Sequence, residues 1–178
     1  NQPPGDATAE QMKKLSIIAK QYSHGEIRVT HEQNLVLPHI KNSDLFSVWN
    51  KLRALKLATP NIGLITDTIC CPGMDYCALA TARSIPISQK ISQHFKDQSI
   101  QDKIGNIKIK ISGCINACGH HHVGNIGILG LDRNGEESYQ ISLGGSADEK
   151  TSIGKIVGPS FSEKELIKAI QTLSLIHI

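Results

Sequence analysis

Five cysteines give the clearest chemical signal in this sequence. Cys71 and Cys77 are separated by five residues, Cys114 and Cys118 by three, and 36 residues lie between the two pairs. Gly, Pro and Asn residues beside them are typical of loops. Thiolates gathered in this way bind zinc or iron–sulfur clusters. The two pairs therefore predict a metal centre carried by loops, while Cys70, the neighbour of Cys71, is interpreted as a packed thiol.

Three kinds of site are compatible with four cysteines. A disulfide framework is typical of small secreted chains, and nothing in the sequence resembles a signal peptide. Four thiolates could close a structural zinc site, but zinc pairs usually have about two to four intervening residues. A cubane cluster held by four thiolates accommodates the longer spacing. An iron–sulfur cluster is the preferred interpretation, with structural zinc as the next.

The cysteine motifs resemble those of a known family. The segments TICCPGMDYCALA and KISGCINACGHHH contain the patterns C-x5-C and SGC-x-N-x-CG. These patterns are similar to the cluster-binding signature of the sirohaem-containing nitrite and sulfite reductases. The resemblance implies that Cys71, Cys77, Cys114 and Cys118 bind a [4Fe–4S] cluster. It also implies that Cys118 joins this cluster to the sirohaem iron and that Asn116 contacts the sirohaem.

Residues 1–60 resemble the ferredoxin-like half-domain of the same family, through GDATAEQ and RVTHEQNLVLP. The resemblance implies that Arg28, Thr30, Gln33 and Asn34 lie near the sirohaem. The eight carboxylates of that tetrapyrrole need cationic and hydrogen-bonding partners, which these side chains could supply. The alternative is a strand–turn–strand segment whose polar side chains are solvated.

Three consecutive histidines, His120, His121 and His122, follow the last cysteine. Consecutive side chains do not converge easily on one metal ion, so solvated or structural roles are preferred. Contact with sirohaem carboxylates is the alternative. Arg83 and Lys90 are interpreted as surface charges.

The pattern of residues 1–60 predicts two helices and two strands. Thr8 and Gln11 form a capping box, which marks the start of a helix. Apolar residues then recur at helical spacing as far as Tyr22. The expected elements are a helix over 8–22, strands over 26–30 and 34–38, and a helix from 42 or 43 to 55.

Residues 61–172 predict a second domain. Apolar and lysine residues alternate over 107–111, which predicts a strand with one buried and one solvated face. Asn134 and Gly135 mark a hairpin turn. The expected elements are strands over 61–67, 106–112, 126–132 and 137–143, a helix capped by Asp75 that carries Cys77, a helix over 86–95, a strand or connector over 152–157, and a final helix from the capping box of Ser162 and Glu165 to about Thr172.

The predicted fold class is therefore α+β. The resemblance implies a ferredoxin-like half-domain over 1–60, followed over 61–172 by a sirohaem and [4Fe–4S] domain with a mixed sheet and flanking helices. Residues 173–178 (LSLIHI) match the translation of a common sequencing adapter and are expected to be non-native. Because the chain also begins at Asn1 without a methionine, we expect it to be a fragment.

Composition narrows the functional classes further. A net charge of +3 and an aromatic content of 4% argue against a nucleic-acid partner. No apolar run approaches the roughly 20 residues needed to cross a bilayer, so no membrane partner is expected. The sequence contains no Walker loop, no GxGxxG motif after a strand and no nucleophile elbow. Cysteines that stay reduced, without a targeting segment, favour the cytoplasm.

The resemblance implies an oxidoreductase of the assimilatory type. Such an enzyme takes six electrons to reduce nitrite to ammonia or sulfite to sulfide, from a donor such as ferredoxin or a flavoprotein reductase. The Arg and Lys residues that clamp the anionic substrate are expected in a half that this sequence does not contain, so the chain alone is expected to be inactive. Two alternatives are a cluster-binding or electron-transfer module without a substrate site, and an enzyme of the precorrin-3B synthase type.

Overall fold

A computed structural model describes residues 4–175 of the chain. These residues form two compact units, one over Pro4–Ile62 and one that begins at Gly63. Each unit has secondary structure and buried side chains of its own.

The first unit has the predicted order of helix, strand, strand, helix. Thr8 caps the first helix: its Oγ1 accepts a hydrogen bond from the Gln11 N–H at 3.2 Å, and the Gln11 side chain accepts one from the Thr8 N–H at 2.9 Å. This reciprocal pairing confirms the capping box. The helices pack together, burying Leu15 and Ile18 of one and Val48 of the other. The elements are α1 (Ala9–Tyr22), the antiparallel strands β1 (Arg28–Val29) and β2 (Leu35–Val36), and α2 (Leu45–Ala54).

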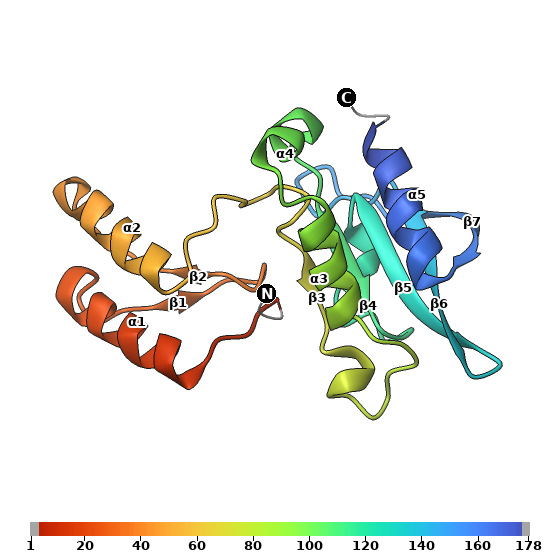
Figure 1. Ribbon diagram of the computed structural model, residues 1–178, viewed down its shortest axis with the longest axis horizontal. Coiled ribbons are helices and arrows are strands. Elements are labelled where there is room, and N and C mark those ends of the chain that lie inside the picture. The colour runs from red at the N-terminus through yellow and green to blue at the C-terminus, as the bar shows by residue number, and fades with distance from the viewer. Residues whose placement is uncertain (1–3, 176–178) are drawn as a thin grey trace. The chain divides into compact units, whose positions relative to one another are not determined.

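The described part of the second unit, residues 63–175, contains a five-stranded mixed sheet in the order β3-β4-β5-β6-β7. Strands β3, β4 and β5 run parallel, and β6 and β7 continue the sheet antiparallel. The strands are β3 (Ile69–Cys70), β4 (Ile109–Ser112), β5 (Ile126–Arg133), β6 (Glu136–Leu143) and β7 (Lys155–Phe161), and the helices are α3 (Ile85–His94), α4 (Gln98–Ile104) and α5 (Glu163–Leu175). Helices α3 and α5 lie beside each other on one face of the sheet (Figure 1).

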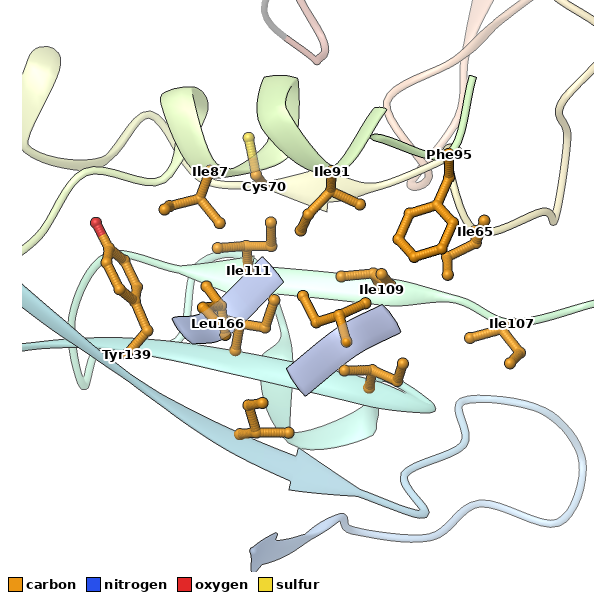
Figure 2. Close-up of a cluster of buried hydrophobic side chains, with 14 of the residues drawn as sticks. Ile65, Cys70, Ile87, Ile91, Phe95, Ile107, Ile109, Ile111, Tyr139 and Leu166 are labelled. Carbon is orange, nitrogen blue, oxygen red and sulfur yellow. The ribbon is translucent and has the colours of Figure 1, made fainter. Parts of the chain in front are cut away.

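The hydrophobic core lies between that face and the two helices. Strand register places Cys70, Ile111, Ile128 and Ile141 in one row across four strands. Figure 2 shows side chains of α3, among them Ile87, directed toward this row. The row is almost fully buried, and each such side chain contributes about 1.5–3 kcal/mol through removal from water. This core holds the central strands, and therefore their ends, in place.

On the opposite face of the sheet, Lys110, Gly127 and Ser142 lie in one register row, and the connection between β4 and β5 covers it. A Cβ added to Gly127 would lie only 2.0 Å from the carbonyl oxygen of His121, so this connection touches the sheet directly. Lys110 on β4 shares this face and is 4% exposed. The prediction of a solvated lysine face was therefore wrong, because a loop covers it.

Two predicted elements around the first cysteines are also absent. No strand forms over 61–67; there the chain turns, with Gly63 at φ +76° and its N–H bonded to the Asp67 carboxylate at 2.9 Å, and the strand is β3. No helix carries Cys77. A short 3₁₀ turn, η2 (Gly73–Asp75), precedes it instead, and the N–H groups of Thr81 and Ala82 both donate to the Gly113 carbonyl. Tertiary hydrogen bonds replaced the helical ones.

Other predictions for this unit agree more closely with the structure. The hairpin turn is confirmed, since Asn134 and Gly135 adopt φ of +57° and +86° between β5 and β6. Helix α3 agrees with its prediction to within one residue at each end, and the connector over 152–157 leads into β7. Helix α4 was not predicted. Helix α5 ends three residues beyond the expected Thr172, and residues 176–178 of the expected non-native tail lie outside the described residues.

Candidate metal centre

The two cysteine motifs begin at the carboxyl ends of adjacent parallel strands. Cys71 follows β3, and Cys114 follows β4 after a single glycine. Register places Cys70 opposite Ile111, and the Cys71 N–H donates to the Ile111 carbonyl at 3.1 Å. Because the carboxyl ends of parallel strands meet at one edge of a sheet, the two loops start side by side. The sheet thus brings together two motifs that the sequence holds far apart.

Cys71 is the most firmly held of the four candidate ligands. Its Sγ accepts a hydrogen bond from the Gly113 N–H at 3.1 Å and lies 3.3 Å from the Ser84 hydroxyl. Its side chain is buried, at 8% exposure. Hydrogen bonds to a cysteine sulfur tune the potential of a cluster that it binds. These two contacts hold the Cys71 sulfur in a fixed position beside the ends of β3 and β4.

Glycines allow the two loops to pack closely. Gly73 has φ +62°, and an added Cβ there would lie 2.5 Å from the Ser84 nitrogen. A Cβ on Gly113 would lie 2.6 Å from the Ala82 carbonyl oxygen. Any larger residue at either position would push the segment 82–84 away from the strand ends. The glycine of the CPG motif thus serves loop-to-loop packing.

The second loop is a compact pair of turns. The Ala117 N–H donates to the Cys114 carbonyl at 3.2 Å, and the His120 N–H donates to the Ala117 carbonyl at 2.7 Å. Ala117 and His120 both have left-handed φ, at +57° and +54°. The Gly119 N–H then donates to the Ser112 hydroxyl at 3.1 Å, which fastens the loop to the end of β4. Both thiols of this pair are therefore carried on one anchored loop.

The four candidate ligands differ in exposure. Cys114 is buried, Cys77 is half-buried and Cys118 is exposed, and all of them are free thiols. The Cys118 thiol lies 4.0 Å from the carbonyl of Asn116, whose side chain is exposed. Over residues 4–175, no three His, Cys, Asp or Glu side chains are arranged closely enough to hold a metal ion. The structure brings the loops together without closing a coordination sphere.

Cys70 faces away from this site. It is 2% exposed within the core. Burial, and then the neighbouring Cys71, raise the pKa of its thiol to about 12. A thiol that resists deprotonation is a poor metal ligand. The structure agrees with the interpretation of Cys70 as a packed residue.

The three histidines do not act as a group. His121 is 4% exposed, whereas His120 and His122 are exposed. Burial, and then the charge of His122, whose ring centroid is 4.0 Å away, lower the pKa of His121 to about 4. Its Nδ1 atom has no hydrogen-bond partner in the described part of the chain. The His121 ring is therefore buried and neutral near pH 7, which agrees with the structural role preferred from the sequence.

Four of the residues predicted to lie near sirohaem, Arg28, Thr30, Gln33 and Asn34, are in the hairpin of the first unit. Thr30 and Asn34 close its turn: the Thr30 N–H donates to the Asn34 carbonyl at 2.9 Å, and the Asn34 N–H donates to the Thr30 hydroxyl at 3.1 Å. Gln33 sits in this turn with φ +60°. The Arg28 Nε lies 2.6 Å from a carboxylate oxygen of Glu26. These side chains belong to one hairpin, and their placement near a sirohaem stays a prediction.

Sequence reasoning missed one group beside the first cysteine loop. Arg83, interpreted as a plain surface charge, contacts the carboxylates of Asp75 and Glu137. Glu137 is 54 positions away in the sequence, so no local pattern could have indicated the pair. The pairing of β6 with β5 in the sheet places the Glu137 carboxylate beside Arg83.

Comparison with known protein families gives two matches. Residues 63–177 match the nitrite and sulphite reductase 4Fe-4S domain. Residues 1–55 match the nitrite/sulfite reductase ferredoxin-like half domain. The first description names the expected [4Fe–4S] cluster, which is thereby confirmed for the family. The two matches also confirm the predicted fold class.

Individual relatives agree with these matches. The chain is 28% identical to the chloroplastic ferredoxin–nitrite reductase of Spinacia oleracea, over 94% of this chain and 29% of that protein. It is 32% identical to the coenzyme F420-dependent sulfite reductase of Methanocaldococcus jannaschii, over 72% of this chain and 20% of that protein. The chain therefore spans less than a third of either relative.

Solved structures share the fold. The NirA protein of Mycobacterium tuberculosis superposes with a TM-score of 0.78 at 22% identity, over 95% of this chain and 33% of that one. Dissimilatory sulfite reductase I superposes with a TM-score of 0.77 at 14% identity, over 96% of this chain and 61% of that one. Between residues 4 and 175, none of the helices is both long and apolar enough to span a bilayer. By its two domain matches, which together cover nearly the whole sequence, this chain belongs to the nitrite and sulfite reductase family.

Proposed function

We propose that this chain supplies the cluster-binding part of an enzyme that reduces nitrite to ammonia or sulfite to sulfide with six electrons. The observation that carries the proposal is the placement of both cysteine motifs at the ends of the adjacent parallel strands β3 and β4. The hydrogen bond from the Gly113 N–H to the Cys71 sulfur adds to it, because it fixes the position of that sulfur at this edge of the sheet.

Cys71, Cys77, Cys114 and Cys118 would hold the [4Fe–4S] cluster. Their chemistry fits, since all four are free thiols on two adjacent loops. Cys118 is the exposed member and, following the family resemblance, would also ligate the sirohaem iron. When bound, the cluster would store one electron and the sirohaem iron would take the substrate. The task of this chain is then to fix the thiolates and to shield the buried pair, Cys71 and Cys114, from water.

The first unit would contribute to the sirohaem site. Arg28 would offer a cation to the tetrapyrrole carboxylates, while Thr30, Gln33 and Asn34 would offer hydrogen bonds. Following the family resemblance, Asn116, exposed in the second cysteine loop, would also offer a hydrogen bond to a sirohaem. Arg28 pairs with Glu26 through its Nε, so contact with a tetrapyrrole carboxylate would use its two terminal nitrogens or replace this pair.

The substrate would be a small anion, nitrite or sulfite, and the electron donor would be a ferredoxin or a flavoprotein reductase. The relatives' names support the two anions, nitrite in one case and sulfite in another, and the first of these names also supports a ferredoxin donor. We further propose a cytoplasmic location. Because the cationic residues that clamp the substrate are expected outside these 178 residues, we propose that the chain alone does not turn over either anion.

Anaerobic reconstitution tests the assignment of the ligands. Incubation with iron, sulfide and sirohaem should give a spectrum in which cluster and haem are magnetically coupled. Cys118→Ser should abolish the coupling, whereas Cys70→Ala should retain it, because Cys70 lies in the core. Stoichiometric binding of zinc, together with the absence of any cluster spectrum, would contradict the proposal.

Assays with a chemical electron donor test the proposal that the chain alone reduces neither nitrite nor sulfite. The reconstituted chain should consume neither nitrite nor sulfite when supplied with reduced viologen. Sustained ammonia or sulfide production by the chain alone would show that it contains a complete substrate site.

A further inference from the structure

Arg83 joins two carboxylates that come from different parts of the second unit. Its Nε donates to Asp75 Oδ1 at 3.2 Å, and its Nη1 donates to Glu137 Oε1. The Arg83 main-chain N–H also donates to Glu137 Oε2, at 2.8 Å. Side chain and backbone thus bind Glu137 together, while the side chain alone reaches Asp75.

The Glu137 end of this arrangement is rigid. Glu137 lies on β6, where it is paired with Asp132 of β5, and β6 also pairs with β7 from Tyr139 onward. The Tyr139 hydroxyl lies 3.0 Å from Glu137 Oε2 and 3.0 Å from the Arg83 carbonyl. Tyr139 is 3% exposed, and burial, followed by the charge of Glu137, raises the pKa of its phenol well above the usual range, so it stays a hydrogen-bond donor. Arg83 is therefore fastened to the sheet through Glu137 and Tyr139.

The Asp75 end lies within the first cysteine loop. Asp75 closes the η2 turn two residues before Cys77, and the Cys77 N–H donates to the Gly73 carbonyl at 2.9 Å, across the same turn. A contact that restrains Asp75 therefore also restrains the turn that precedes Cys77. Without the predicted helix at this point, the segment depends on tertiary contacts of this kind for its order.

We propose that Arg83 is a positioning residue for Cys77. Its guanidinium pairs with both Asp75 and Glu137 and so fixes the turn Gly73–Asp75 to the sheet. This contact determines the position of the Cys77 thiol. The inference rests on the proposed function, because it gives Cys77 its role as a cluster ligand. Arg83 acts by ordering the first cysteine loop, and it does so before any cluster binds.

The size of the effect follows from exposure. The side chains of Arg83, Asp75 and Glu137 are 51%, 31% and 24% exposed, so the network is partly solvated. Networks of this kind hold a loop more firmly than an isolated surface pair does. We expect that loss of the guanidinium raises the rate of chemical modification at the Cys77 thiol about fivefold.

The test is alkylation of the reduced, cluster-free chain by iodoacetamide, followed at each cysteine by mass spectrometry of peptides. Arg83→Gln should speed the reaction at Cys77 about fivefold. Arg83→Lys should restore part of the protection, because it keeps the charge. Lys90→Gln is the matched control, since it removes a similarly exposed cation that pairs with Glu163 elsewhere in the same unit. It should leave the rate at Cys77 unchanged.

Two results would overturn the proposal. One is an unchanged rate at Cys77 in Arg83→Gln. The other is a parallel increase at Cys70, which is reached only when the core opens and which would therefore indicate general unfolding. Asp75→Asn, which cuts the same contact from the loop side, must reproduce the effect at Cys77. Since none of these measurements uses a cluster, failure of the reconstitution above would be recognised separately.

Discussion

The second cysteine loop should tolerate no side chain at Gly119. A Cβ built there would lie 1.8 Å from the Ile111 carbonyl oxygen, whereas Cβ atoms essentially never come closer than 3.0 Å to a neighbour. The clash is with the backbone of the central strand β4, which is hydrogen-bonded on both sides and cannot yield. Gly119→Ala must therefore displace the loop by more than 1 Å.

The loss of stability expected from Gly119→Ala has two parts. Forcing extra volume against a packed backbone costs about 1–3 kcal/mol. The displacement also breaks the bond from the buried Gly119 N–H to the Ser112 hydroxyl, and an unsatisfied buried donor costs about 1–3 kcal/mol. We expect Gly119→Ala to lower the free energy of unfolding by about 3 kcal/mol or more in total. With a urea dependence of about 2 kcal/mol per molar, the midpoint should fall by about 1.5 M.

Urea unfolding followed by far-ultraviolet circular dichroism provides the assay. Gly135→Ala is the matched control: its added Cβ meets nothing within 4 Å, and only its φ of +86° penalises the alanine, by about 1–2 kcal/mol. Trp49, the single tryptophan, lies in the first unit, so its fluorescence should report an unchanged transition. If Gly119→Ala costs no more than Gly135→Ala, the loop is not seated on β4 as described.

Three further predictions concern packing, capping and pH. Ile111→Ala should lower the free energy of unfolding by about 2–5 kcal/mol, whereas Ile115→Ala, at 78% exposure, should change it by less than about 0.5 kcal/mol, both measured by urea unfolding. Thr8→Ala should cost about 1 kcal/mol through loss of the α1 cap, seen in the urea transition of Trp49 fluorescence, and an unchanged transition would refute the capping role. Because the pKa of His121 is lowered from 6.5 to about 4, the unfolded state binds the extra proton first, so stability should decline as the pH falls from about 6.5 to about 4. His121→Gln should flatten that decline in stability curves of the cluster-free chain, and an equal decline in the variant would assign it to other groups.

Local patterns predicted the elements whose cause is local. The capping box of Thr8 and Gln11 and the turn at Asn134 and Gly135 are each formed by residues within three positions of one another. Such features depend on intrinsic backbone preferences, which the sequence displays directly. The cysteine motifs were likewise recognisable because their spacing is fixed within each loop.

Features with a distant cause were missed. The helix expected around Cys77 gave way to hydrogen bonds from Thr81 and Ala82 to Gly113, more than 30 positions away. The alternation over 107–111 suggested a solvated face, yet Lys110 is buried because the connection to β5 folds over it. Neither the covering loop nor the partner of Arg83 can be read from nearby residues, since both depend on strand order in the sheet.

The parallel pairing of β3 with β4 also has a consequence for assembly. The residues that β3 and β4 bring opposite each other, such as Cys70 and Ile111, are about 40 positions apart in the chain, with α3 and α4 in the intervening crossover. Contacts between such distant segments require closure of the intervening loop, which slows folding. The two thiol pairs therefore meet only once β3 and β4 have paired. If all four cysteines hold a cluster, as proposed, the complete set of ligands would be available only after β3 and β4 have paired.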